Sequence, residues 1–168
     1  MKYSLLLIVL LAAPLTHVPA HAHGEKKHVA AAPVAAEQTA WGIAGKPAQV
    51  NRTVTLDMTD AMRLTPDRLT VQEGDTVRFI VRNQGGMRHE MVIGTSAELA
   101  KHAAMMARFP NMEHDEAYMA HVGPGQSGEI VWHFNRAGSL EFACLIAGHY
   151  EAGMRGTITV TPKQGAAK

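Results

Sequence analysis

Between residues 50 and 162, short runs of alternating apolar and polar residues are separated by turn residues. In "DTVRFIVRN", the apolar side chains of Val77, Phe79 and Val81 occupy every second position. Such alternation is typical of a strand that has one face in the core and the other in solvent. The same rhythm recurs in "RTVTLDM", "MRHEMVIG", "GEIVWHFN", "SLEFAC" and "RGTITVT". The pattern predicts a single all-β domain over residues 50–162, folded as a β-sandwich.

One segment inside this region has a helical pattern instead. "TSAELAKHAAMMARF" is rich in Ala, Leu, Lys and Met, which favour helices, and either Thr95 or Ser96 is suited to cap its first turn. We therefore expect one short helix, about three turns long, inserted between two strands.

The two ends of the chain show neither pattern. Residues 1–22, "MKYSLLLIVLLAAPLTHVPAHA", combine a charged start, an apolar run and small residues suited to cleavage after Ala20 or Ala22. This combination predicts a secretory signal peptide; an uncleaved anchor is the alternative, although the run is short for a membrane span. We expect residues 23–49 to form a flexible leader rich in His, Ala and Pro, and residues 163–168 a disordered tail. The predicted location is the periplasm, with no membrane anchor after cleavage.

The net charge and the single cysteine limit the classes of function that the chain can have. The formal net charge of +1 over 168 residues offers no basic footprint for nucleic acid. The chain has ten methionines and ten histidines but a single cysteine, Cys144, which cannot close an internal disulfide. A lone thiolate in an oxidising compartment is open to oxidation unless a ligand such as a metal occupies it. An intermolecular disulfide and an inert buried thiol remain as alternatives.

Strand phase indicates that two candidate metal ligands point into the core. In "MRHEMVIG", His89 shares one face with the apolar residues Met87, Met91 and Ile93. In "SLEFAC", Cys144 is in phase with Leu140 and Phe142. Each residue alone is typical of an ordinary core position, but two inward ligands near strand ends favour a shared metal site.

The stretch "CLIAGHYEAGM" adds two more ligand types, because His149 and Met154 follow Cys144 with four residues in each gap. Together with His89 they supply two imidazoles, a thiolate and a thioether. A trigonal two-His-one-Cys site with a long axial Met is the arrangement of a type 1 copper centre. Zinc also accepts Cys and His, but its structural sites usually recruit further cysteines, which this chain lacks. Copper is the predicted cofactor, as one type 1 ion.

The order and spacing of these four residues resemble the cupredoxins, the type 1 or blue copper proteins, over roughly residues 50–161. "GHYEAGMRGTITV" and "RHEMVIG" look most like the periplasmic cupredoxins linked to copper resistance. The resemblance implies a Greek-key sandwich with copper held by the four ligands. Glu90 stands where many members have Asn, and Ala147 where close relatives often have Pro. We expect these departures to tune the centre without removing the metal.

The predicted function is copper tolerance, through copper binding and either oxidation or sequestration of copper(I). A one-electron shuttle between periplasmic redox partners is the alternative, with the edge of His149 as the electron exit. A multicopper enzyme is not expected, because Ala143 and Leu145 flank Cys144 where such enzymes have histidines that couple copper centres. Weak oxidation of copper(I) is the only catalysis that we expect.

The surplus of methionine and histidine predicts a second copper surface. In "HAAMMARFPNMEHDEAYMAHVG", a helix would place His102, Met105 and Met106 on one face. These methionines either fill an irregular core seam or bind copper(I) as soft thioethers, and the sequence leaves both alternatives open. This second surface would bind additional copper weakly. Its candidate residues are His21, His23, His28, His102, Met105, Met106, Met112, His114, Met119 and His121.

Overall fold

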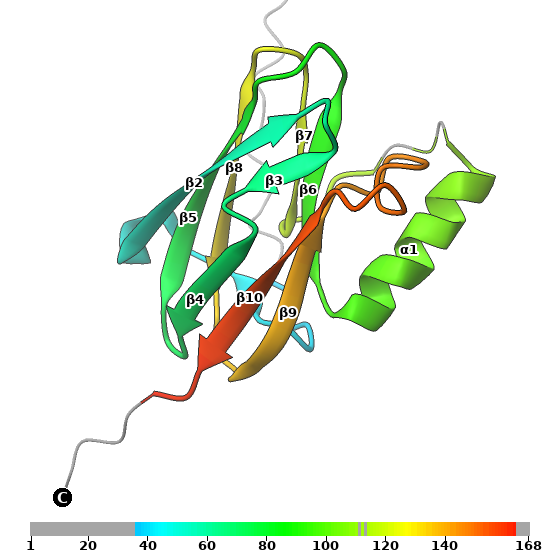
Figure 1. Ribbon diagram of the computed structural model, residues 1–168. Coiled ribbons are helices and arrows are strands. Elements are labelled where there is room, and N and C mark those ends of the chain that lie inside the picture. Colours follow the sequence, from blue (N-terminus) through cyan, green and yellow to red (C-terminus); the bar gives the residue numbers. More distant parts are fainter. Residues whose placement is uncertain (1–35, 111, 113, 164–168) are drawn as a thin grey trace, which may run out of the picture. The chain divides into compact units, whose positions relative to one another are not determined.

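Two five-stranded β-sheets form the domain, which confirms the predicted sandwich (Figure 1). The computed structural model describes residues 36–110, 112 and 114–163. The first sheet has the strand order β1-β8-β5-β2-β3, and the second has the order β4-β10-β9-β6-β7. The pairs β2/β5 and β4/β10 are parallel, and all other neighbouring strands are antiparallel. The predicted signal peptide, most of the predicted leader and His21, His23 and His28 lie outside the described residues.

The elements have the following bounds. The first sheet contains β1 (Ile43–Ala44), β2 (Arg52–Thr59), β3 (Arg63–Thr65), β5 (Thr76–Asn83) and β8 (Ser127–His133). The second contains β4 (Arg68–Gln72), β6 (His89–Gly94), β7 (Met119–Val122), β9 (Gly138–Ala143) and β10 (Arg155–Thr161). A 3-10 helix spans Pro47–Gln49, and the helix α1 spans Ser96–Arg108.

The core is filled by inward-facing residues of both sheets, and these are the residues that the alternation predicts to face inward. Val77, Phe79 and Val81 of β5 have no exposed surface, and the largest buried side chain is that of Trp132 on β8. Each such side chain stabilises the fold by about 1.5–3 kcal/mol through burial. Met87 is an exception to the predicted phase: it is 42% exposed, because β6 and its alternation begin only at His89.

Strand β1 lies inside the segment that we expected to be a flexible leader, and this part of the prediction is corrected. Ile43 and Ala44 pair with β8, and Trp132 Nε1 donates a hydrogen bond to the carbonyl of Trp41 at 3.0 Å. A Cβ at Gly42 would lie 2.4 Å from the same Nε1, so this close approach requires glycine. A strand of two residues is too short to show alternation, and for this reason the sequence pattern did not reveal it.

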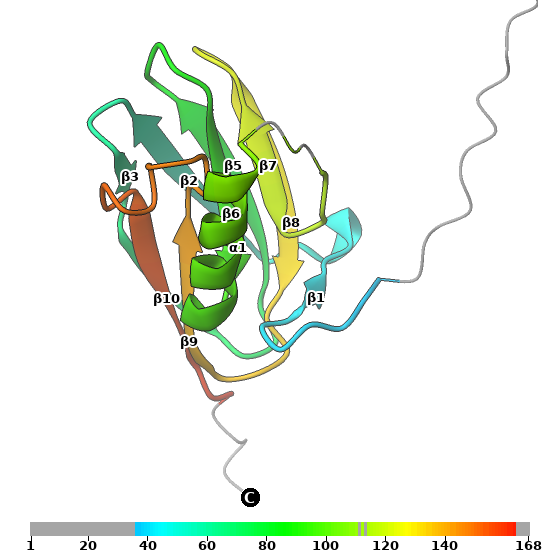
Figure 2. The ribbon, with the colours of Figure 1, turned by 90° about the vertical axis from the view of Figure 1, so that its right-hand side faces the viewer.

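Helix α1 packs against β6 and β9, on the side away from the sandwich core (Figure 2). Thr95 caps the helix, since its side chain accepts a hydrogen bond from the backbone N–H of Glu98 at 3.2 Å. The buried helix residues Leu99, Ala103 and Met106 meet the outward-facing side chains of the two strands. Every residue of β6 is therefore buried, because one face lies in the sandwich core and the other lies under the helix.

Among residues 36–110, 112 and 114–163, no helix has the length and apolar character needed to cross a bilayer.

Candidate metal centre

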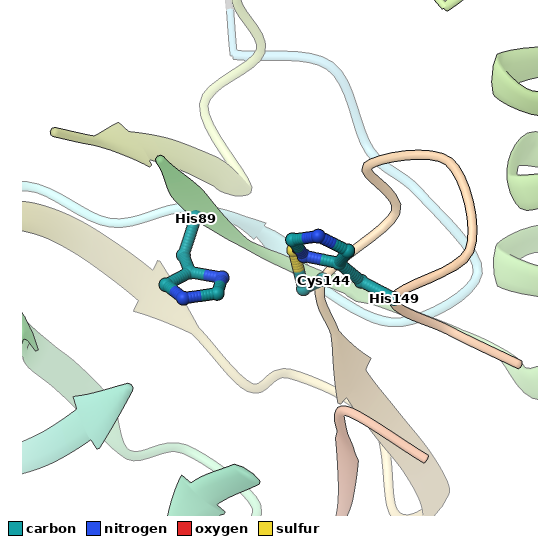
Figure 3. A group of neighbouring side chains, drawn as sticks. All are labelled: His89, Cys144 and His149. Carbon is teal, nitrogen blue, oxygen red and sulfur yellow. The ribbon is translucent and has the colours of Figure 1, made fainter. Parts of the chain in front are cut away.

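His89, Cys144 and His149 come together where β6 begins and β9 ends (Figure 3). One candidate ligand atom from each residue lies within 4.8 Å of those of the other two. Cys144 Sγ is 3.3 Å from His149 Nδ1, and the centroids of the two imidazole rings are 5.1 Å apart. The two side chains predicted to point inward, His89 and Cys144, are both fully buried.

In the loop between β9 and β10, backbone hydrogen bonds join Cys144, His149 and Met154, which are separated by four residues in each gap. The N–H of Cys144 donates to the carbonyl of Met154 at 2.9 Å, and the N–H of Met154 donates to the carbonyl of His149 at 3.0 Å. Gly148 has a φ of +86°, a left-handed conformation that glycine adopts without strain. Met154 has no exposed surface and packs in the main core. These bonds tie the backbone of Met154, the fourth predicted ligand, to the backbones of Cys144 and His149.

Asp60, in the turn between β2 and β3, orients the ring of His89 and fixes its tautomer. Its Oδ1 lies 3.0 Å from His89 Nε2, and its carboxylate also accepts hydrogen bonds from the backbone N–H groups of Gly86 and Met87. The hydrogen bond from Gly86, followed by that from His89, lowers the pKa of Asp60, which is therefore a carboxylate at neutral pH. A carboxylate accepts from Nε2–H, and this tautomer leaves a lone pair on Nδ1.

His89 Nδ1 is the clearest sign that the site is built for a metal. This nitrogen is buried and has no hydrogen-bond partner, although buried polar atoms normally have one. It belongs to the residue cluster that also offers the sulfur of Cys144 and an imidazole nitrogen of His149. A soft thiolate and two neutral imidazoles suit copper in either oxidation state, so the donor set fits the predicted ion.

The thiol of Cys144 depends on a metal to become a thiolate. Burial raises its pKa to about 12, although hydrogen bonds from the backbone N–H groups of Glu90 and Ile146 act in the opposite direction. Without a metal the residue is therefore a neutral thiol at physiological pH. Metal binding must release this proton, so uptake depends on pH.

Glu90 gives the centre a second layer of support. It is 2% exposed, and its Oε1 accepts a hydrogen bond from the backbone N–H of Leu145 at 3.0 Å. Its Oε2 lies 3.0 Å from His121 Nδ1, while His121 Nε2 donates to the carbonyl of His114 at 2.9 Å. The residue after His89 is thus tied to the residue after Cys144. Burial raises the pKa of Glu90, and the charge of His121 opposes this effect.

His149 is the most accessible of the clustered ligands. It is partly buried and, with Met87, Met112 and Ile146, lines a hollow of about 410 Å³. Desolvation, followed by repulsion from His89, lowers the pKa of its imidazole, which favours the neutral, metal-binding form.

The seven described members of the predicted second copper surface fall into separate places. Met106 and Met119 are buried in the apolar cluster beneath α1, as the core alternative requires. Met112 and His121 line the hollow beside His149. The other three, His102, Met105 and His114, line a different hollow of about 370 Å³ next to α1, which we call the histidine hollow.

Sequence reasoning missed Asp60 and the structural role of Glu90. Asp60 lies 29 positions before His89, and no motif joins the two residues. Glu90 was noted only as a departure from the resemblance. The one available signal was a carboxylate in a run of apolar residues, which marks a buried position that needs partners.

Comparisons with known proteins extend this picture. Residues 50–161 match the family of copper binding proteins described as the plastocyanin/azurin family. The chain is 45% identical over 144 residues to the copper-resistant cuproprotein CopI of Rubrivivax gelatinosus, covering 86% of this chain and 80% of that protein. It is 40% identical over 114 residues to CopI of Vibrio cholerae, covering 67% and 68% of the two chains. The reduced auracyanin of Roseiflexus castenholzii superposes with a TM-score of 0.59 at 22% identity, covering 67% of this chain and 99% of that one, and supports the fold alone.

Proposed function

The chain belongs to the plastocyanin/azurin family of copper-binding proteins, and on this premise we propose that it is a periplasmic type 1 copper protein that serves copper tolerance. The observation that carries the proposal is the unpartnered, buried Nδ1 of His89 beside Cys144 and His149. The names of the relatives, copper-resistant cuproproteins, support the physiological part. The signal-peptide pattern of residues 1–22 supports the location.

In this proposal His89, Cys144 and His149 would hold the copper, and Met154 would supply a weak thioether ligand. Bound copper would supply one-electron exchange between its two oxidation states. The protein excludes water from the buried ligands, orients His89 through Asp60, and ties the ligand loop together through the backbone of Met154. Ligands held in this way need little rearrangement when the charge on the metal changes.

Absorption and electron paramagnetic resonance spectra of the copper-loaded, oxidised protein test the site. We expect an intense visible band, because charge transfer from the thiolate to copper(II) is strong, and we expect Cys144→Ser to abolish it. A colourless wild-type protein, or an unchanged band in Cys144→Ser, would refute the type 1 assignment.

Copper tolerance is tested by growth of a deletion strain in rising copper concentrations. We expect increased sensitivity that the wild-type gene restores and the Cys144→Ser gene does not. The finer part of the proposal is that the protein sequesters copper, so copper(I) added in excess should be bound without sustained oxygen consumption. Sustained consumption would instead favour oxidation of copper(I).

An electron shuttle is the second candidate function, because the partly buried ring of His149 opens onto a hollow lined by Met87, Met112 and Ile146. An opening at a ligand edge whose apolar lining is joined by Arg88, Glu90 and His121 is suited to a redox partner. Growth in copper that is unaffected by the deletion, together with loss of a periplasmic electron-transfer activity, would favour this alternative.

A further inference from the structure

The histidine hollow contains imidazole donors that the copper centre does not use. His102 lies on α1, and His114 lies on the irregular segment that follows this helix. Their rings are 4.8 Å apart between centroids and are tilted by 32°. Two residues twelve positions apart, one on the helix and one beyond its end, are thus brought together.

His102 repeats the feature that marks the copper centre. Its Nε2 is buried and has no hydrogen-bond partner. A buried, unpaired nitrogen costs about 1–3 kcal/mol of desolvation unless a ligand compensates for it. Burial, followed by the charge of His114, lowers the pKa of His102, so the ring is neutral at physiological pH and keeps a lone pair for a metal.

Met105 adds a soft ligand on the same side of the helix. It lies three positions after His102 and is 39% exposed, whereas its neighbour Met106 is 6% exposed and belongs to the core. Both His102 and Met105 line the hollow together with His114. An exposed thioether beside two imidazoles is a donor set that suits copper(I).

The surroundings of the hollow also favour a cation. Glu98 and Glu116 are among the lining residues, against a single lining lysine, Lys101. His114 is held in place through its carbonyl, which accepts a hydrogen bond from His121 Nε2. Its ring is partly buried and belongs to a segment without helix or strand.

We propose that His102, His114 and Met105 form a second copper site that takes copper(I) as cargo, separate from the type 1 centre. This inference rests on the proposed role in copper tolerance, and it places the binding of copper(I) as cargo in the histidine hollow. A cargo site should exchange its ion, and its partly exposed donors suit exchange better than the closed copper centre does. No electron transfer is required of this site.

An anaerobic copper(I) titration against a chromophoric copper(I) chelator tests the proposal on the full-length protein. We expect wild type to hold one copper(I) more than the type 1 centre accounts for. His102→Gln and His114→Gln should each weaken binding of that additional ion at least about tenfold, because loss of an outer-shell partner alone already costs that much affinity. Met105→Leu should weaken it several-fold.

Met112→Leu is the matched control, because Met112 is 36% exposed, much as Met105 is, but does not line this hollow. It should leave the second affinity unchanged. X-ray absorption at the copper edge of the doubly loaded protein should show a sulfur contribution that falls in Met105→Leu and persists in Met112→Leu.

The visible band of the oxidised protein separates this inference from the proposed function. All four variants should keep the band and the wild-type melting temperature, which shows that they fold and retain the type 1 centre. The inference is overturned if wild type with an intact band holds no additional copper(I), or if His102→Gln and His114→Gln retain it. A wild-type protein without the band would instead defeat the proposed function.

Discussion

The copper centre and the histidine hollow present similar donor atoms but hold them in different ways. His89, Cys144 and Met154 have no exposed surface, and they are anchored by a carboxylate and by backbone hydrogen bonds. In the hollow, His102 and His114 are partly buried, and Met105 is 39% exposed on the surface of a helix. Chemical type alone therefore does not decide what a ligand set does. Rigid, enclosed donors suit a resident ion, and adaptable, accessible donors suit an ion that is exchanged.

The two sites also depend on different parts of the core. Of the proposed copper ligands, His89 begins β6 and the others lie on the loop between β9 and β10, where Cys144 and Met154 belong to the main core. The hollow instead depends on α1 and the apolar cluster beneath it. Glu90 and His121 connect the two regions, because they link the backbone of Leu145 at the copper loop to the carbonyl of His114. The first three of the following changes are designed to affect one region and leave the other intact, and the fourth compares the two.

The largest effect should come from the helix that carries the hollow. Met106→Ala should lower the free energy of unfolding by about 2–5 kcal/mol, because it removes a buried side chain and leaves a cavity. The neighbouring change Met105→Ala should stay within about 0.5 kcal/mol, as expected for an exposed position. Urea unfolding of the copper-free proteins measures both values. Equal losses would mean that the two methionines do not differ in packing as the structure shows.

Asp60→Ala should weaken the copper centre alone. Without the carboxylate, His89 is no longer held in one tautomer and the backbone at Gly86 loses a hydrogen-bond acceptor. Loss of such a partner typically lowers metal affinity by about 10–100-fold. Asp60→Asn is the control, because its amide oxygen still accepts from Nε2–H and should preserve most of the affinity. Competition with a copper chelator measures the change, and an unaltered affinity in Asp60→Ala would remove Asp60 from the site.

Met154→Leu should raise the reduction potential and retain the visible band. Copper(I) tolerates a site with three ligands better than copper(II) does, so loss of the fourth donor favours the reduced ion, by an amount on the order of 60 mV for each tenfold change in relative affinity. Met58→Leu is the matched control, because Met58 is equally buried but belongs to β2. Redox titration followed in the visible band gives both values. An unchanged potential in Met154→Leu would argue against an axial role.

The smallest effect should be a loss of stability in mild acid. Desolvation lowers the pKa of His102 and of His149 in the folded protein, so the unfolded chain binds more protons as the pH falls below the ordinary value of about 6.5. The free energy of unfolding of the metal-free protein should therefore decrease from that pH downward. His102→Gln and His149→Gln should each flatten the dependence in urea unfolding series. A dependence that persists in the double variant would place its origin elsewhere.

Local pattern was sufficient to predict much of this fold. Period-two alternation identified β2, β5, β6, β8, β9 and β10 because each buries one face in the sandwich, and the helix cap at Thr95 follows from its own hydroxyl group. Strands β1, β3 and β7 escaped notice because strands of two to four residues carry too few alternations to stand out from turns. Strand β4 was missed although its five residues do alternate, with Leu69 and Val71 buried. Met87 was placed on the wrong face because alternation was extended one step beyond the start of β6.

The sequence by itself determined the ligand types, their order and the inward direction of His89 and Cys144, because strand phase and loop spacing are local properties. Only the tertiary structure decided which of the remaining methionines and histidines are core residues and which line the histidine hollow. Met105 and Met106 are adjacent in the chain, and the way α1 packs on its sheet puts one in solvent and the other in the core. The pairing of Asp60 with His89 and of His102 with His114 likewise arises from long-range packing, which no local pattern encodes.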